Sequence, residues 1–214
     1  MNVQAAESEQ GSTRQGRRRA PLGEARRERI VAVAFQEFSA NGYRGASLAR
    51  IAAGAGLTQP GLLHHFRSKA DLLIAVLEER DRRDSERHDI DLDAQVPWRT
   101  ALRNLTALVE HNARAAGLVQ LFTVMTAEAV TEDHPARRWA VERYRRLEGY
   151  AGRALQQGID DGEVRPEVDA VVCAQRIFSM MDGLQLQWLL DPDRVDMAAV
   201  FRGFMDDLER SIEV

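Results

Sequence analysis

Apolar residues recur every three or four positions along most of this chain, which is the spacing of one face of an α-helix. The first such stretch covers residues 24–40 and should end at Asn41 and Gly42, because glycine after a helix readily adopts the left-handed backbone that closes it. Shorter helical segments follow within residues 47–67, and long ones continue to residue 212. No stretch has the pattern of a convincing strand, so the sequence predicts an all-α protein.

Residues 47–71 predict two short helices joined by a tight turn and running into a third helix. Ser47 and Thr58 each precede a helical pattern, where a hydroxyl can accept a hydrogen bond from the first-turn amides. Gly54 and Gly56 lie between the two helices, where a left-handed or closely packed backbone is needed. A short helix, a glycine turn and a second helix with a polar outer face form the shape that fits a DNA major groove.

A set of matched positions in this segment carries a family resemblance. They lie within residues 24–73 and comprise Gly42, Tyr43, Ser47, Leu48, Ile51, Ala52, Ala55, Gly56, Leu57, Thr58, His65, Phe66, Arg67, Ser68 and Lys69. Together they resemble the DNA-binding domain of the TetR family of transcriptional regulators. One position departs from the family: Leu63 stands where a tyrosine usually touches the DNA backbone, and it offers an apolar contact to a thymine methyl group instead.

The resemblance implies that the second short helix lies in the major groove. There Gln59 suits an adenine edge, and His64 can donate to a guanine or a phosphate. For His65 two interpretations stay open, a DNA contact or packing against the helix that precedes the pair. Other candidates lie at helix starts or beside the groove and would hold phosphates. The candidate DNA contacts are Arg44, Ser47, Arg50, Thr58, Gln59, Gly61, Leu63, His64, His65 and Lys69.

The net charge of −4 is divided unevenly along the chain. Residues 1–69 hold eleven basic and five acidic residues, whereas residues 70–214 hold 18 basic and 28 acidic ones. A basic segment on an acidic body is typical of a DNA-binding head, although a merely solvated surface would give the same count. Residues 1–22 are polar and predict a flexible arm, whose Arg17, Arg18 and Arg19 either follow DNA or form a solvated tail.

Beyond Lys69 the pattern predicts a helical bundle. A long connector helix is expected over residues 69–88, apolar at first and then heavily charged, and the charged half indicates a solvated surface. Further helices are expected over 97–116, 118–130, 136–159, 167–190 and 196–212, with a break at Gly117. The expected domains are a basic arm (1–22), a three-helix helix-turn-helix domain (23–69) and a larger helical domain for ligand binding and dimerisation (70–214), the last resembling the family only in length and helix count.

Candidate effector contacts are aromatic, apolar or polar residues on the bundle helices, and core packing is the alternative interpretation for each. They are His111, Phe122, Met125, Trp139, Tyr150, Phe178 and Gln185. The last two helices would pair with their copies in a second subunit, although part of their apolar surface must face the subunit's own core. The candidate interface residues are Met181, Leu184, Trp188, Phe204 and Leu208.

These features predict a ligand-responsive regulator that binds a palindromic DNA operator as a homodimer and is released by a small-molecule effector. The family resemblance implies that the protein represses transcription rather than activating it. The alternative is a ligand-independent DNA-binding or architectural protein that uses the bundle only to dimerise. An enclosed cavity of several hundred Å³ in the bundle would favour the sensor over this alternative.

Other classes of protein are not expected. The sequence has no nucleophile elbow, no glycine-rich phosphate loop after a strand, and no carboxylate–histidine set at metal spacing, so neither an enzyme nor a cofactor is predicted. His64 and His65 diverge by about 100° on a helix and have no third ligand at a suitable spacing. The absence of an apolar run of about 18 residues and the single cysteine, Cys173, predict a cytoplasmic protein with one buried thiol.

Overall fold

A computed structural model describes residues 22–88 and 91–214 of the chain, and within them regular structure is helical. The helices are α1 (Leu22–Gly45), α2 (Leu48–Gly54), α3 (Gln59–His65), α4 (Lys69–His88), α5 (Trp98–Asn112), α6 (Ala116–Glu128), α7 (Arg137–Asp160), α8 (Ala170–Leu190) and α9 (Met197–Ile212). In the described part of the chain there is no β-strand, only an isolated bridge between Val164 and Glu213. The all-α prediction is confirmed, whereas Arg17, Arg18 and Arg19 of the predicted arm lie outside the described residues.

One predicted helix boundary is wrong. The break expected at Gly117 lies earlier: α5 ends at Asn112, and Gly117 belongs to the first turn of α6, where its Cα faces the ring of Phe35. The start of α6 has no side-chain cap, so no capping residue marks the true boundary in the sequence. The neighbouring glycine was therefore a misleading signal, because glycine is tolerated in a helix that tertiary packing holds in place.

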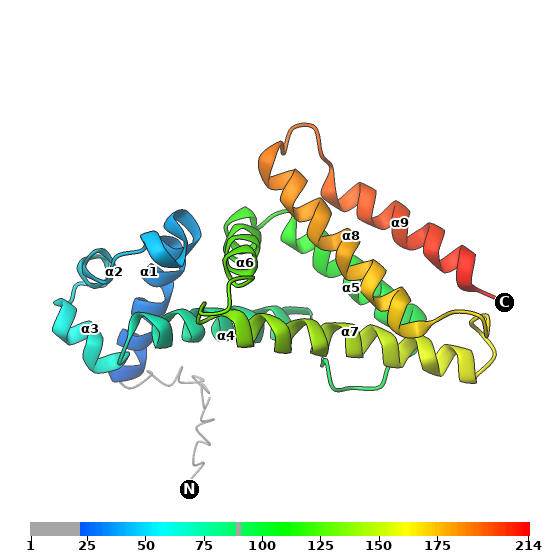
Figure 1. The fold of residues 1–214 in the computed structure, drawn as a ribbon, viewed down its shortest axis with the longest axis horizontal. Coiled ribbons are helices and arrows are strands. Elements are labelled where there is room, and N and C mark those ends of the chain that lie inside the picture. Colours follow the sequence, from blue (N-terminus) through cyan, green and yellow to red (C-terminus); the bar gives the residue numbers. More distant parts are fainter. Residues whose placement is uncertain (1–21, 89–90) are drawn as a thin grey trace, which may run out of the picture.

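Helices α1, α2 and α3 form a head at one end of the molecule, and α4 leads from it toward the other helices (Figure 1). The inner face of α1 is fully buried at Ile30, Ala34 and Phe38, and it packs on Ile51 of α2 and Leu62 of α3. Apolar residues three and four apart on α1 thus supply the scaffold on which the two short helices rest.

Buried apolar residues form two separate clusters, named here the head core and the body core. The head core joins α1–α4 with α6 and the start of α7, and it includes Ile30, Phe38, Ile51, Leu62, Leu73, Leu77, Leu121, Phe122, Met125 and Trp139. The body core joins α5, the rest of α7, α8 and α9, and it includes Trp98, Leu105, Leu147, Tyr150, Ile177, Phe178, Met181, Leu184 and Phe201. The head core therefore continues past residue 69, because α6 packs extensively on α1.

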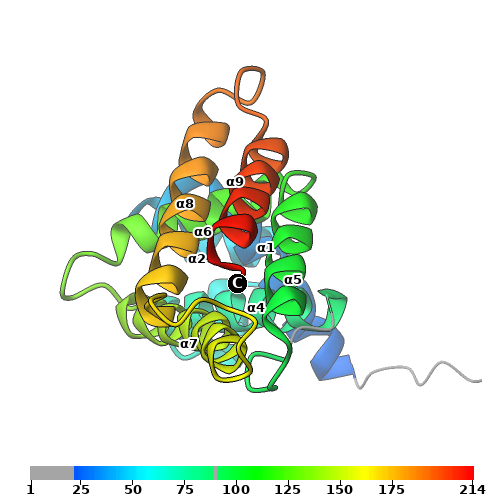
Figure 2. The same cartoon turned by 90° about the vertical axis from the view of Figure 1, so that its right-hand side faces the viewer.

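The body core is a helical bundle at the end of the molecule opposite the head. Figure 2 looks along it and shows α5, α8 and α9 above α7. Gly158 allows α7 to approach α5, since a Cβ there would lie only 2.6 Å from Cδ1 of Trp98. Cys173 is buried in this core as predicted, and burial raises the pKa of its thiol. None of the described helices is long and apolar enough to cross a membrane.

Candidate DNA interface and ligand site

The predicted caps of the short helices are present. Ser47 Oγ accepts a hydrogen bond from the Arg50 amide at 3.4 Å, and Thr58 Oγ1 accepts one from the Gly61 amide at 3.2 Å. Each hydroxyl satisfies a first-turn amide that has no partner inside its own helix. The start of α3 is therefore held rigidly, with the Thr58 hydroxyl committed to the cap.

The turn between α2 and α3 depends on two glycines for different reasons. Gly56 has a φ of 71°, in the left-handed region that other residues rarely adopt. At Gly54 the constraint is space, because a Cβ would lie 2.8 Å from Cγ1 of Val33 on α1. Both expectations for the turn are confirmed, and the turn fixes how α3 lies against α2.

Glu37 of α1 locks the start of α2 in place. Its Oε1 accepts from the Ser47 amide at 2.9 Å and from Arg50 Nε at 2.8 Å, and Arg50 Nη2 also donates to the Gly45 carbonyl at 3.0 Å. The hydrogen bond from Arg50 holds the pKa of Glu37 below its usual range, despite partial desolvation. Arg50, expected as a phosphate contact, is thus largely engaged within the head, and sequence reasoning missed Glu37 because its partners lie 10 and 13 positions away.

The outer face of α3 carries a small set of exposed side chains. Thr58, Gln59 and His64 are exposed, while Gly61 and His65 are half-buried. Leu63, expected to point outward, is half-buried and packs against the head core, because its position on the short helix lies at the edge of the buried face. The exposed face of α3 therefore presents Gln59 and His64, with Leu63 recessed beside them.

Basic groups gather at the corner where α1 meets α2 and α4 begins. Lys69 Nζ donates to the Arg44 carbonyl at 3.2 Å and lies 4.9 Å from the centre of the Tyr43 ring, a cation–π distance. Arg44 itself is exposed. On the start of α1 the guanidinium of Arg27 lies 4.6 Å from the centre of the Phe66 ring. Lys69 and Arg27 therefore lie next to the end of α3, since Phe66 directly follows that helix.

Comparison with known proteins agrees with this geometry in both halves. The family model for bacterial regulatory proteins of the tetR family matches residues 30–76 of the sequence. The family model for the C-terminal region of BetI-type transcriptional repressors matches residues 97–212. The chain belongs to the TetR family. It is therefore related to DNA-binding transcriptional regulators, and the resemblance noted in its helix-turn-helix extends across the helical body.

Individual TetR-family proteins resemble the chain over most of its length. The fatty acid metabolism regulator protein of Bacillus subtilis is 24% identical over 184 residues, covering 86% of this chain and 93% of that protein. A solved structure of a TetR transcriptional regulator from Chloroflexus aurantiacus has a TM-score of 0.75 and 23% identity, and the match covers 90% of this chain and 98% of that one. The structure of FadR from B. subtilis with stearoyl-CoA has a TM-score of 0.68 and 23% identity, and the match covers 84% of this chain and 95% of that one. These structures share the fold.

The structure divides the candidate ligand residues between the two cores. Phe122, Met125 and Trp139 lie in the head core, while Tyr150 and Phe178 lie in the body core. The hydroxyl of Tyr150 is bonded to Asn104 at 2.9 Å, and Gln185 is buried with no partner for its Oε1, whereas His111 is half-buried on α5. The predicted residues are therefore divided between the two cores.

A charged and aromatic cluster lies at the border of the head core, where α4, α6, α7 and α8 meet, and sequence reasoning missed its charged members. Asp81 of α4 accepts from Trp139 Nε1 at 2.8 Å and from Arg143 Nη1 on α7. The guanidinium groups of Arg80 and Arg143 each lie 5.0 Å from the centre of the Phe122 ring. The side chains of Arg80 and Asp81 are only 3% and 23% exposed, so the prediction that the charged half of α4 is solvated is wrong at these two residues. The side chain of Arg143 on α7 is 12% exposed.

On the α8 side of this cluster Tyr144 donates its hydroxyl to Asp182 Oδ2 at 2.5 Å. Burial raises the pKa of both groups, and for Asp182 the nearby Arg143 and the Tyr144 hydrogen bond oppose the increase. The cluster therefore joins the connector helix α4 to α7 and α8 through polar contacts between largely buried side chains. Such an arrangement can recognise a polar group of a small molecule.

The residues expected at a dimer interface fall into two groups. Met181 and Leu184 are each 6% exposed and pack in the body core, so they face mainly their own subunit. Trp188, Phe204 and Leu208 are only partly buried against that core. The exposed apolar residues on α8 and α9 are Val171, Val172, Leu186, Leu190 and Val200. An amphipathic pattern could not separate these two sets.

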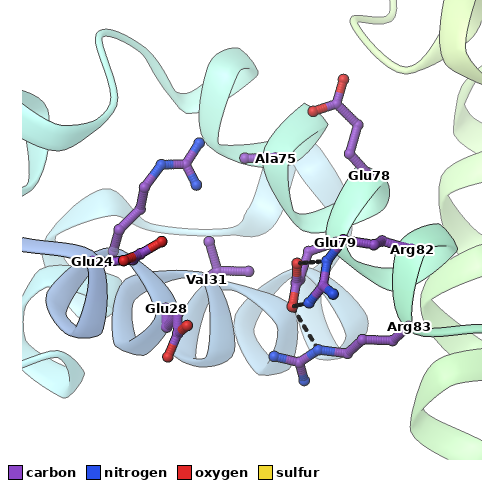
Figure 3. Close-up of a pocket in the computed structure, with 9 residues that line it drawn as sticks. Glu24, Glu28, Val31, Ala75, Glu78, Glu79, Arg82 and Arg83 are labelled. Atoms are coloured by element: carbon purple, nitrogen blue, oxygen red, sulfur yellow. Dashed lines mark hydrogen bonds and ion pairs between the residues drawn. The ribbon is translucent and has the colours of Figure 1, made fainter. Parts of the chain in front are cut away.

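A groove of about 620 Å³ lies between α1 and α4. Figure 3 shows the Glu79 carboxylate between Arg82 and Arg83, with Glu24 and Glu28 of α1 facing them across the groove. Glu79 accepts from Arg82 at 2.8 Å and from Arg83 at 2.6 Å. Hydrogen bonds from these arginines hold the pKa of Glu79 below its usual range. These ion pairs are local to α4 and stiffen the connector beside the head.

Proposed function

We propose that this TetR-family chain is a repressor that binds an approximately palindromic operator as a homodimer and is released by a small-molecule effector. The observation that carries the proposal is the exposed face of α3. Its helix start is capped, its turn is fixed by Gly54 and Gly56, and Gln59 and His64 project from it. A rigid polar face flanked by cations is what direct readout of a major groove requires.

In this proposal Gln59 and His64 contact base edges, and Leu63 contributes an apolar edge for a thymine methyl group. Lys69 and Arg44 hold phosphates at the corner of α1 and α4. Ser47 and Thr58 act through the caps that orient the starts of α2 and α3, Gly61 is an outward position of the first turn of α3, and His65 lies at the groove margin. Arg50 acts chiefly through Glu37, by fixing the start of α2.

Two subunits are proposed to pair through α8 and α9. Between these helices lies a groove of about 520 Å³ whose lining includes Val172, Met180, Gly183 and Phe204. A Cβ on Gly183 would meet nothing within 4 Å, so a partner helix can approach closely there. Exposed apolar side chains border the groove, as expected of an interaction surface. Two heads would then read two half-sites, because one helix-turn-helix buries little DNA.

The effector is proposed to bind near the charged and aromatic cluster at the border of the head core. This cluster contains Phe122 and Trp139 from the predicted set, and it also contains Arg80 and Asp81 of the connector α4. FadR from B. subtilis has the same fold and its structure holds stearoyl-CoA, which supports a ligand in this kind of body. An effector that binds one dimer geometry better than the other shifts the population toward it and changes the spacing of the heads.

Selection of bound sequences from random duplex DNA at near-physiological salt tests the proposal. An inverted repeat should emerge, together with a sedimentation coefficient for the complex that corresponds to an even number of subunits. The rival is an architectural protein that uses the bundle only to dimerise. It predicts no enriched motif and binding that disappears as salt rises, since phosphate contacts alone are strongly salt-dependent.

A further inference from the structure

The end of α6 touches the head at the corner between α1 and α2. Glu128, the last residue of α6, accepts a hydrogen bond from the backbone amide of Tyr43 at 2.7 Å between N and Oε2. The two residues are 85 positions apart, and this hydrogen bond is a polar contact within the interface where α6 packs on α1. A charge-assisted hydrogen bond of this length is among the stronger ones in proteins.

Gly42 provides the space for this carboxylate. Its φ of 66° exposes the following amide, and a Cβ at this position would lie 2.4 Å from Glu128 Oε1. Any other residue would therefore push the carboxylate away from the Tyr43 amide. The glycine that ends the long helical stretch of α1 thus has a second role, which is to admit a side chain from the body.

His134, in the turn that follows α6, supports the same carboxylate. Its Nδ1 accepts from the Ala136 amide at 3.2 Å, which assigns the proton to Nε2, and Nε2 lies 3.4 Å from Glu128 Oε2. The distance is that of a close polar contact without hydrogen-bond alignment. The His134 side chain is 3% exposed, and its ring meets the Tyr43 ring edge-on, with 5.1 Å between the ring centres. Burial lowers the pKa of His134, which keeps the ring neutral.

Tyr43 continues this chain of contacts to the DNA side. Lys69 at the start of α4 lies over its ring, and the next residue, Arg44, supplies the carbonyl that Lys69 binds. A displacement of the Tyr43 backbone would therefore move the cations that flank α3. The path from Glu128 to these cations consists of direct contacts at every step.

We propose that Glu128 is a positioning residue for operator binding, steadied by His134. Its carboxylate holds the corner of α1 and α2 in the orientation that presents α3 and the flanking cations to DNA. The inference rests on the proposed function, since it assumes a specific operator. It adds to that function one polar contact within the α6–α1 interface, which orients the end of α1 separately from the tilt of α4.

The test compares wild type with Glu128→Ala, Glu128→Gln and the control Glu132→Ala on the selected operator. Glu132 lies in the same α6–α7 turn and is exposed. Glu128→Ala should weaken operator binding about tenfold, the effect of losing one charge-assisted hydrogen bond. Glu128→Gln should restore most of the affinity, because its amide oxygen still accepts from Tyr43. Glu132→Ala should bind like wild type.

A second readout separates positioning from general stability. Spin labels at Arg67→Cys in a Cys173→Ala background report the distance between the two heads of the DNA-free dimer. Glu128→Ala should broaden that distance distribution, whereas a merely structural role would lower the unfolding midpoint and leave the distribution of folded dimers unchanged. Should Glu128→Ala fail to fold, Glu128→Asp carries the same comparison: its carboxylate is one methylene shorter and is drawn away from the Tyr43 amide, so it should also broaden the distribution.

The outcomes distinguish the inference from the function on which it rests. If wild type selects no operator, the proposed function fails first. If wild type binds its operator, and Glu128→Ala matches Glu132→Ala in both affinity and head-to-head distance, the positioning role is overturned while the proposed function stands. Equal losses in Glu128→Ala and Glu128→Gln, with unchanged distances, would also overturn it.

Discussion

The clearest energetic prediction concerns Asp81, which ties the connector helix to α7. Asp81→Ala removes the acceptor of Trp139 Nε1 and the partner of Arg143, and leaves that guanidinium in a site where its side chain is 12% exposed. Breaking a buried pair by removing one partner costs about 3–5 kcal/mol. Because Asp81 is 23% exposed, water reaches part of the site, and the lower end of that range, about 3 kcal/mol, is expected.

Urea unfolding followed by far-ultraviolet circular dichroism measures this loss, with protein concentration held fixed because dimerisation adds to the apparent stability. In a thermal scan the same loss corresponds to a midpoint lower by about 6–12 °C for a chain of this size. Asp81→Asn should lose less than Asp81→Ala, since its amide oxygen can still accept from Trp139.

The matched control is Glu142→Gln on α7. Glu142 pairs with Arg138 on the protein surface, where both side chains are more than half exposed, so its removal should leave the unfolding free energy unchanged within error. A loss below about 1 kcal/mol in Asp81→Ala, comparable with this control, would refute the reasoning that the cluster is a buried electrostatic tie.

Three further predictions address DNA binding and pH. Lys69→Ala should weaken binding to every sequence and reduce the slope of log K against log salt by about one unit, measured by fluorescence anisotropy. Gln59→Ala should relax preference at one or two base pairs at a cost of about 1–3 kcal/mol, measured by repeating the sequence selection. Burial and Arg44 lower the pKa of His134, although Glu128 opposes them, so the unfolded state takes up the proton first as pH falls. The free energy of unfolding should therefore decrease as pH drops below about 6.5. His134→Asn should flatten that decrease, measured by urea unfolding at a series of pH values.

The helix-turn-helix could be predicted because its determinants are local. The hydroxyls of Ser47 and Thr58 act on amides three residues away, and Gly56 is required by its own backbone angle. Such local determinants can be recognised in a single sequence. The predicted break at Gly117 failed for the opposite reason, because the packing of α6 on α1, rather than any local residue, decides where that helix begins.

The charged members of the charged and aromatic cluster could not be predicted because their contacts are distant in sequence. Arg80 and Asp81 lie in a charged run that looks the same whether its partners are water or the side chains of Trp139 and Arg143, which are 58 and 62 positions from Asp81. The tie from Glu128 to Tyr43 spans 85 positions and involves a backbone amide, which leaves no trace in residue type. Tertiary packing alone brings these groups together.

The central claim is that the exposed face of α3 reads DNA sequence, with two heads acting together. The measurement that tests it most directly is the dissociation constant for the selected inverted repeat, for a single half-site and for a scrambled duplex, each at several salt concentrations. The account predicts that the full repeat binds at least about 10³-fold more tightly than the scrambled duplex, with the half-site far weaker than the repeat. Equal affinity for all three duplexes, lost in parallel as salt rises, would contradict it.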